Sequence, residues 1–167
     1  KYKMPYVWWL DRIMIPVSIG GAMVRIGNLI NSEIVGHVTD VPWGFKFVRN
    51  FPNIPIENIP VQHPSQLYEA LCYLGTGILL KGLYHYALDK MKKGWFLGIF
   101  FIGIFGTRFL IEFIKEPQVA FEQGMTLNMG QLLSIPFVLM GIGLLVWGAI
   151  KKEPAKRIEP QKRGRVQ

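Results

Sequence analysis

Arg25 and Arg108 are the residues most able to do chemistry here, because each lies inside a long apolar segment. A guanidinium group stays protonated at any accessible pH, and placing one at the centre of a membrane helix costs about 2.5–3.5 kcal/mol on insertion scales. Its planar fork of N–H donors matches the oxygens of a phosphate. Two such residues in one apolar chain therefore predict a site that holds an anion at membrane depth.

Other polar side chains recur at helical spacing around these arginines. Asn28 and, less well, Asn31 share a helical face with Arg25, at steps of three residues. Glu112 follows Arg108 by four residues, so its carboxylate could partly neutralise that arginine. Structural ion pairs are the alternative reading, but two arginines with several amides at one depth favour a binding site. The remaining polar candidates stand at the ends of apolar segments: Glu33, His63, Gln66, Tyr68, Glu69, Asn128 and Gln131.

Four apolar segments are long enough to position these residues across a bilayer, at about 10–31, 66–88, 94–115 and 128–150. They are apolar on nearly all sides, which is typical of membrane helices rather than amphipathic surface helices. When successive helices alternate in direction, all the polar candidates fall toward the same leaflet. The sequence therefore predicts an all-α polytopic membrane protein with about four transmembrane helices and one buried polar cavity.

The net charge of +8 is distributed unevenly. Because the positive-inside rule places basic connections in the cytoplasm, we expect both termini inside and a site toward the outer leaflet. Basic residues at helix ends do not resemble a nucleic-acid patch, so no nucleic acid is expected. The predicted domains are a transmembrane helical domain at 1–150 and a basic cytoplasmic tail at 151–167. The basic residues on the inner side are Lys1, Lys3, Lys90, Lys92, Lys93, Lys151, Lys152, Lys156, Arg157, Lys162, Arg163 and Arg165.

The connection at about 32–65 faces outward in this topology. Its prolines exclude a long regular element, and its aromatic residues suit the membrane interface. We expect an ordered outer-face loop that lies on the bilayer, with short strand-like pieces. Cys72 is the single cysteine of the sequence and lies among apolar neighbours, so we expect it to be a packing residue.

Four segments together resemble the phosphatidylglycerol–prolipoprotein diacylglyceryl transferase family. VRIGNLINSEIVGHVTDVPWG at 24–44 is similar to the family signature, with its Arg-x-Gly-Asn-x-x-Asn-x-Glu core. HPSQLYEA at 63–70, GTRFLIEFIKEP at 106–117 and LNMGQLLSIP at 127–136 match three further blocks in family order. The chain departs at Val24, where the family usually has Gly, and at Ile104, where it often has Tyr. The resemblance identifies the chain with the C-terminal portion of the family's protein.

The resemblance implies transfer of the diacylglyceryl group of phosphatidylglycerol to the lipobox cysteine thiol of a prolipoprotein, with release of glycerol phosphate, in the bacterial inner membrane. The partners would be phosphatidylglycerol, the prolipoprotein signal peptide and membrane lipids. The thiol belongs to the substrate, and neither a metal cluster nor a cofactor motif appears in the sequence, so neither group is expected. The catalytic candidates are Arg25, Arg108, Glu33 and His63. The substrate-binding candidates are Arg25, Asn28, Asn31, Gly36, Gln66, Tyr68, Glu69, Glu112 and Gln131.

Two other functions remain open from the sequence. One is a small membrane transporter subunit that binds anions or lipids, although charges at a single depth do not line a path across a membrane. The other is an inactive fragment of the transferase that retains lipid binding. Residues 1–23 do not supply the His-Gly-Gly motif of the family's N-terminal half, which leaves open whether this chain alone is active.

Overall fold

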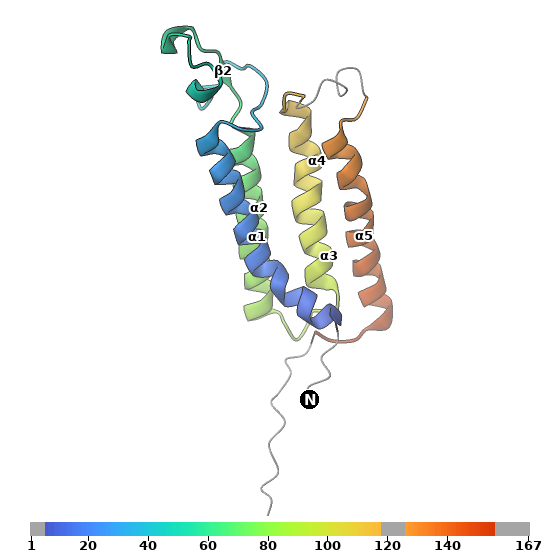
Figure 1. Cartoon of the computed structure of the whole chain (residues 1–167). Helices are drawn as coiled ribbons and strands as arrows, with labels where there is room; N and C mark the ends of the chain where they lie inside the picture. Colours follow the sequence, from blue (N-terminus) through green and yellow to red (C-terminus); the bar gives the residue numbers. More distant parts are fainter. Residues whose placement is uncertain (1–5, 118–125, 156–167) are drawn as a thin grey trace, which may run out of the picture.

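Four long helical rods make up the computed structural model, which describes residues 6–117 and 126–155. The third rod, called the α3–η4 rod below, joins α3 to a π-helical turn, a short α-helix and a 3₁₀ turn. α1 packs against α2, and the α3–η4 rod packs against α5 (Figure 1). The elements are α1 (Tyr6–Asn31), α2 (Ser65–Tyr86), α3 (Trp95–Phe101), η3 (Ile102–Gly106), α4 (Thr107–Ile111), η4 (Glu112–Ile114) and α5 (Met129–Lys151).

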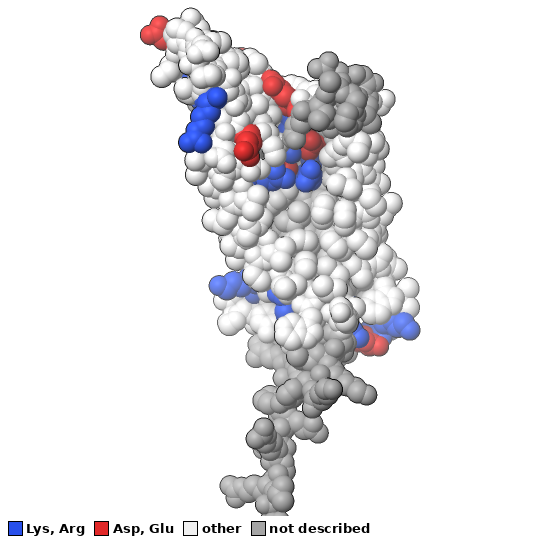
Figure 2. Space-filling model, in the orientation of Figure 1, with Lys and Arg blue, Asp and Glu red and all other residues white. Residues whose placement is uncertain are grey.

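Three of these rods are long and apolar enough to cross a membrane: α1, the α3–η4 rod and α5. α2 is similar in length, with 22 residues, but it carries more polar side chains. Figure 2 shows a broad uncharged band between two charged ends of the molecule. The prediction of a helical, multi-pass membrane protein is confirmed, and the expected count of about four corresponds to four rods, three of which meet the length and hydropathy of a membrane span.

Small residues set the distance between the α3–η4 rod and α5. A Cβ atom at Gly98 would lie 2.9 Å from the carbonyl oxygen of Gly141, and one at Gly141 would lie 2.9 Å from that of Gly98. Gly148 meets the Trp95 ring in the same way, at 2.7 Å. Lipid tails are as apolar as the side chains, so moving a side chain from lipid into a helix contact gains little free energy. Close packing of the backbones is therefore a main source of helix association in a membrane.

At the inner end, which is the end of the molecule opposite the loop at 32–64, a carboxylate from one helix caps another. The Asp11 carboxylate of α1 accepts hydrogen bonds from Gly94 N at 2.8 Å and from Leu97 N at 3.0 Å. A carboxylate at a helix N-terminus satisfies orphan N–H groups and complements the helix dipole. Asp11 therefore fixes the start of α3 against α1.

The predicted tail begins as an ordered segment. Ala155 N donates to Met91 O at 3.0 Å, and Lys93 pairs with Glu153 at 3.2 Å. These contacts fold the chain after α5 back onto the connection between α2 and α3. The other tail residues that carried the basic-tail prediction, 156–167, lie outside the described residues, as do Lys1 and Lys3.

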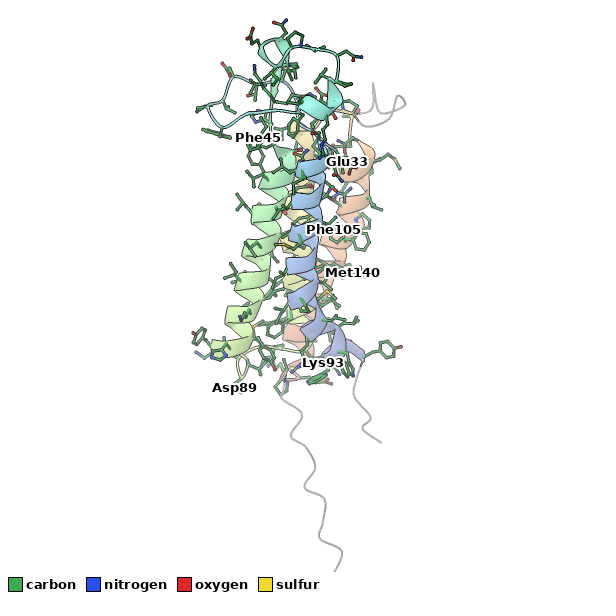
Figure 3. All side chains as sticks on the ribbon, turned by 60° about the vertical axis from the view of Figure 1, so that its left-hand side comes forward. Glu33, Phe45, Asp89, Lys93, Phe105 and Met140 are labelled. Atoms are coloured by element: carbon green, nitrogen blue, oxygen red, sulfur yellow. The ribbon has the colours of Figure 1, made fainter. Side chains whose placement is uncertain are left out.

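The loop at 32–64 is ordered and stands above α1 and α2 (Figures 1 and 3). β1 (Phe45–Lys46) pairs antiparallel with β2 (Val61–Gln62), and two 3₁₀ turns, η1 (Val48–Asn50) and η2 (Ile56–Asn58), lie between them. An isolated bridge between Gly36 and Lys115 ties the loop to the end of the α3–η4 rod. The prediction of an ordered loop with short strand-like pieces is confirmed, and the bridge holds it over the outer end of the helices.

Candidate functional site

Charged side chains gather in a hollow near the outer end, between the α1–α2 pair and the α3–η4 rod (Figure 2). Arg25 comes from α1, Glu69 from α2 and Arg108 from α4. Glu112 begins η4, and Lys115 follows it directly. The site therefore collects charges from three of the four rods, which is the arrangement that the alternating helix directions predict.

Two carboxylates and two cations form a continuous buried ladder across these rods. Arg25 Nε lies 2.9 Å from Glu69 Oε2, a close charge contact that lacks hydrogen-bond alignment. Lys115 Nζ donates to Glu69 Oε1 and to Glu112 Oε2, both at 2.9 Å. The Glu69 side chain is 0% exposed and that of Lys115 is 1% exposed. Charges this deep are stable only when they are paired, so the ladder joins α1, α2 and η4 into one unit.

Arg25 meets the ladder through Nε, so its terminal nitrogens face other groups. With the Asn28 amide oriented to satisfy its neighbours, Oδ1 of Asn28 accepts from Arg25 Nη1 at 3.3 Å and its nitrogen donates to Val24 O at 3.2 Å. The Arg25 guanidinium carbon lies 5.9 Å from the Tyr73 ring centroid. Tyr73 is 5% exposed, so this contact holds the Arg25 guanidinium in the interior of the bundle.

Arg108 follows a π-helical turn, η3, which inserts extra backbone into the rod just before it. Thr107 Oγ1 donates to Gly103 O at 2.6 Å and to Ile104 O at 3.0 Å within this turn. π-turns inside α-helices are frequent at functional sites, because they change the direction in which the following side chains project. The sequence did not predict this irregularity.

The expected partial neutralisation of Arg108 by Glu112 is not seen, and that prediction is wrong. Within residues 6–117 and 126–155, Arg108 makes no ion pair, and its Nε is buried without a hydrogen-bond partner. The rod tightens to a 3₁₀ turn at Glu112, and Lys115 takes the carboxylate instead. Arg108 is therefore the cation of the site that keeps its donors available.

Arg108 and Glu112 line an open groove of about 420 Å³ between the α3–η4 rod and α5. Gly130 of α5 forms part of its wall, where a Cβ atom would lie 2.5–2.7 Å from the carboxyl atoms of Glu112. A second groove on the same seam, of about 530 Å³, is apolar. Its lining residues are Ile102, Gly106, Thr107, Phe109, Leu110, Ile135, Val138 and Leu139.

Two predicted amide residues are fully enclosed near the cluster and keep one polar atom unused. Gln66, 0% exposed, donates to the Glu33 carbonyl oxygen at 2.5 Å, and its own Oε1 has no partner among the described residues. Gln131 joins Asn128 in a capping box at the start of α5, and its Nε2 likewise has no partner in that part of the chain. Buried polar groups are rarely left unpaired, so these atoms fit a ligand or water.

Other predicted site residues lie around the cluster rather than in it. His63 Nδ1 is 3.2 Å from the Tyr68 hydroxyl, which accepts from Trp43 Nε1 at 2.8 Å, so these residues form a separate polar chain between the loop and the start of α2. Asn31 is exposed and accepts from Arg49 at 3.2 Å, instead of continuing the Arg25 face.

Glu33 and Gly36 follow α1 directly. The Glu33 side chain is exposed at the outer end of the helices, where Figure 3 labels it. Gly36 is packed between two segments, because a Cβ atom there would lie 2.7 Å from His63 Cβ and 2.8 Å from the Ile114 carbonyl oxygen. Because Gly36 fits closely between His63 and Ile114, it positions the loop against the α3–η4 rod.

Sequence reasoning missed Lys115 and Gly130. Both stand inside recognised blocks, as IKEP and NMGQ. Lys115 is the last residue of the predicted segment 94–115 and was not counted among the polar candidates. The spacing of three residues between Glu112 and Lys115 is the signal that could have found the ion pair. Gly130 carried no such signal, because its importance comes from the residue opposite.

Comparison of the sequence with known proteins identifies the family of this chain. The sequence model of the family described as prolipoprotein diacylglyceryl transferase matches residues 1–147. The chain belongs to the prolipoprotein diacylglyceryl transferase family. Curated transferases named phosphatidylglycerol–prolipoprotein diacylglyceryl transferase are similar to it: that of Bacteroides fragilis is 43% identical over 152 residues, covering 91% of this chain and 52% of the relative.

Two further members of this transferase family have similar coverage. The Porphyromonas gingivalis protein is 46% identical, over 84% of this chain and 52% of its own length. The Tolumonas auensis protein is 42% identical, over 88% of this chain and 54% of its own length. The chain thus spans about half the length of the curated relatives that it matches. No solved structure matches it.

Proposed function

We propose that this chain carries the phosphate-binding part of a phosphatidylglycerol–prolipoprotein diacylglyceryl transferase site. Arg108 holds the phosphate of phosphatidylglycerol in the groove beside α5, and Arg25 adds positive charge from the ladder on α1. The observation that carries the proposal is Arg108, a permanent cation on an open groove with no carboxylate paired to it within the described chain. A guanidinium fork in this state is a receptor for phosphate oxygens.

The neighbouring apolar groove supports a lipid as the occupant. It lies on the same seam between the α3–η4 rod and α5, and the two grooves share stretches of chain around Arg108 and Pro136. A head group at Arg108 and acyl chains along the apolar groove would match the polarity of both surfaces. The proposed location is the bacterial inner membrane, with the basic end in the cytoplasm and the site toward the outer leaflet.

The chemistry proposed for the complete site is a displacement. The lipobox cysteine sulfur forms a bond to the glycerol carbon that bears the phosphate ester, and the carbon–oxygen bond breaks. The leaving glycerol phosphate takes the bonding electrons, and the thiol proton passes to a base. A free thiol has a pKa of about 8.5, so a base raises the fraction of thiolate. Arginines that contact the phosphate stabilise the negative charge that grows on the leaving group.

Glu33 and His63 are the proposed candidates for that base, and they differ in surroundings. The Glu33 side chain is exposed beside the site, whereas His63 is bonded to the Tyr68 hydroxyl. We assign the base to Glu33, because its carboxylate is open to a thiol that approaches from outside. Glu33→Gln should lower transfer by about 100-fold or more, and His63→Gln by far less. The reverse order would move the role to His63.

The deciding experiment mixes the purified chain with phosphatidylglycerol and a lipobox peptide, and detects the thioether by mass spectrometry. Arg108→Ala should lower transfer by about 100- to 1000-fold while the protein stays inserted in the membrane. Arg108→Lys is the matched variant, since it keeps the charge and loses the fork. Unchanged transfer in Arg108→Ala would remove Arg108 from the mechanism.

A specific observation favours a second candidate, a lipid-binding portion without activity of its own: the chain spans about half the length of its relatives. The same experiment separates the two functions. A wild-type chain that binds phosphatidylglycerol but forms no thioether would be the lipid-binding portion. Binding and product together would establish transfer by this chain alone.

A further inference from the structure

Lys115 is the most enclosed cation of the site. Its side chain is 1% exposed, against 11% for Arg25, and its Nζ is held by Glu69 and Glu112 at 2.9 Å each. Its backbone is held as well, by the bridge to Gly36. A side chain in this position cannot reach a lipid head group in the groove, so its effect on the site must act through the two carboxylates.

Glu112 is the obvious competitor for Arg108. The two side chains line the same groove and are four residues apart, a spacing at which helical Arg and Glu commonly pair. They do not pair, because Glu112 is drawn to Lys115 and lies in the space that Gly130 leaves open on α5. The availability of Arg108 therefore depends on what holds Glu112.

We propose that Lys115 is a positioning residue that keeps Glu112 away from Arg108, so that Arg108 stays available for a phosphate group. This inference rests on the proposed function and deepens it, since it names what keeps the phosphate site open. The cluster of Arg25, Arg108, Lys115, Glu69 and Glu112 has three cations and two carboxylates. Without the Lys115 charge, two cations face two carboxylates, so the cluster has no net positive charge to attract an anion.

The physical reason is the cost of an unpaired charge in a buried place. If Lys115 is neutralised, Glu69 keeps Arg25, but Glu112 has no partner. A buried carboxylate without a partner is strongly unfavourable, and the nearest relief is the guanidinium one helical turn away. Pairing with Arg108 then occupies the donors that a phosphate would use.

The test uses the full 167-residue chain in dodecyl maltoside micelles, a detergent without phosphate, and titrates it with phosphatidylglycerol. Lys115→Gln should weaken binding by about 10- to 100-fold, as expected for losing a hydrogen bond to a charged group. Lys115→Gln combined with Glu112→Gln should return binding to within about threefold of wild type, because the surplus positive charge is restored. A merely structural role for Lys115 would not produce this rescue.

Matched controls separate the two proposals. Lys93→Gln removes a paired lysine at the other end of the molecule and should leave binding unchanged. Arg108→Gln should abolish binding; if it binds as wild type does, the proposed function fails and this inference fails with it. Glycerol phosphate and inorganic phosphate, titrated in the same micelles, tell a lipid head group from a free phosphate, and the Lys115 effect is scored on whichever ligand Arg108→Gln reduces.

Wild-type binding by Lys115→Gln, alongside a weakened Arg108→Gln, would overturn the positioning role alone. Weak binding that persists in the double variant would also overturn it, because Lys115 would then contribute its own charge to the ligand. Thermal unfolding monitors the fold of each variant. If Lys115→Gln cannot be isolated in a folded form, the double variant decides in the same way: restored binding supports the inference and lost binding overturns it.

Discussion

Buried charges have different partners at the two ends of the helix bundle. At the inner end, the Asp11 carboxylate is 1% exposed and accepts from two backbone N–H groups of the neighbouring α3 turn. Arg12 beside it lies 3.7 Å from the centroid of the Trp8 ring and donates to the Trp8 carbonyl oxygen. At the outer end, Arg108 faces an open groove, and amide atoms of Gln66 and Gln131 stay unpaired within the described chain.

This difference separates charges that build the fold from charges that remain for a ligand. Asp11 completes a helix terminus, and each of its two carboxylate oxygens accepts a hydrogen bond from inside the protein. The outer ladder also holds rods together, through ion pairs of Arg25, Glu69, Lys115 and Glu112. Arg108 takes part in none of these ion pairs. Burial of charge alone therefore does not identify a site; unpaired donors beside a groove do.

The largest expected effect separates the two arginines of the outer end. Arg25→Gln removes a paired charge and should lower the free energy of unfolding by about 3–5 kcal/mol, with loss of phosphatidylglycerol binding. Arg108→Gln should change the free energy of unfolding by less than about 1 kcal/mol, with the same loss of binding. Denaturant unfolding and lipid titration of both variants check this. Equal destabilisation would show that Arg108 also has a structural partner.

Asp11→Ala tests the inner end by itself. It leaves two buried N–H groups of the α3 start without an acceptor, so the free energy of unfolding should fall by about 2–4 kcal/mol. The folded fraction should bind phosphatidylglycerol as wild type does, because the site lies at the other end. Asp11→Asn is the matched variant and should lose less, since it keeps an acceptor oxygen. A change in lipid affinity would show that the two ends are coupled.

Gly130→Ala sharpens the comparison at the α5 wall of the site. The added Cβ would overlap the Glu112 carboxyl group, so the Glu112 side chain would have to shift. The free energy of unfolding should fall by about 1–3 kcal/mol. Gly143, where a Cβ would meet nothing within 4 Å, provides the control Gly143→Ala on the same helix. Equal stability of the two variants would mean that the Glu112 carboxylate has room elsewhere.

Cys72→Ala should have the smallest effect. Cys72 is a free, partly buried thiol that packs against the core, and the proposed reaction takes its nucleophile from the substrate. The free energy of unfolding should change by less than about 1 kcal/mol, and transfer or lipid binding should not change. An inactive Cys72→Ala variant that unfolds like wild type would overturn the packing assignment.

The fold was largely predictable because its main signal is local. An apolar run of about 20 residues forms a helix in a membrane, because the backbone must satisfy its own hydrogen bonds there. The four predicted segments agree closely with the helical rods. Irregular backbone was less visible. The π-turn before Arg108 and the 3₁₀ turn at Glu112 lie inside a mainly apolar run, where the residue pattern carries no sign of a change in helix type.

The sequence by itself determined which polar residues gather at the end of the bundle that carries the loop at 32–64, because residue position and alternating helix direction fix the level along the bundle. Only the tertiary structure decided which charges pair. The spacing on one helix favoured Glu112 with Arg108, but Lys115 and the space opposite Gly130 drew that carboxylate away, while Glu69 from another helix met Arg25. Pairing depends on distances of a few ångströms between side chains on different rods, and such distances exist only once the rods have packed.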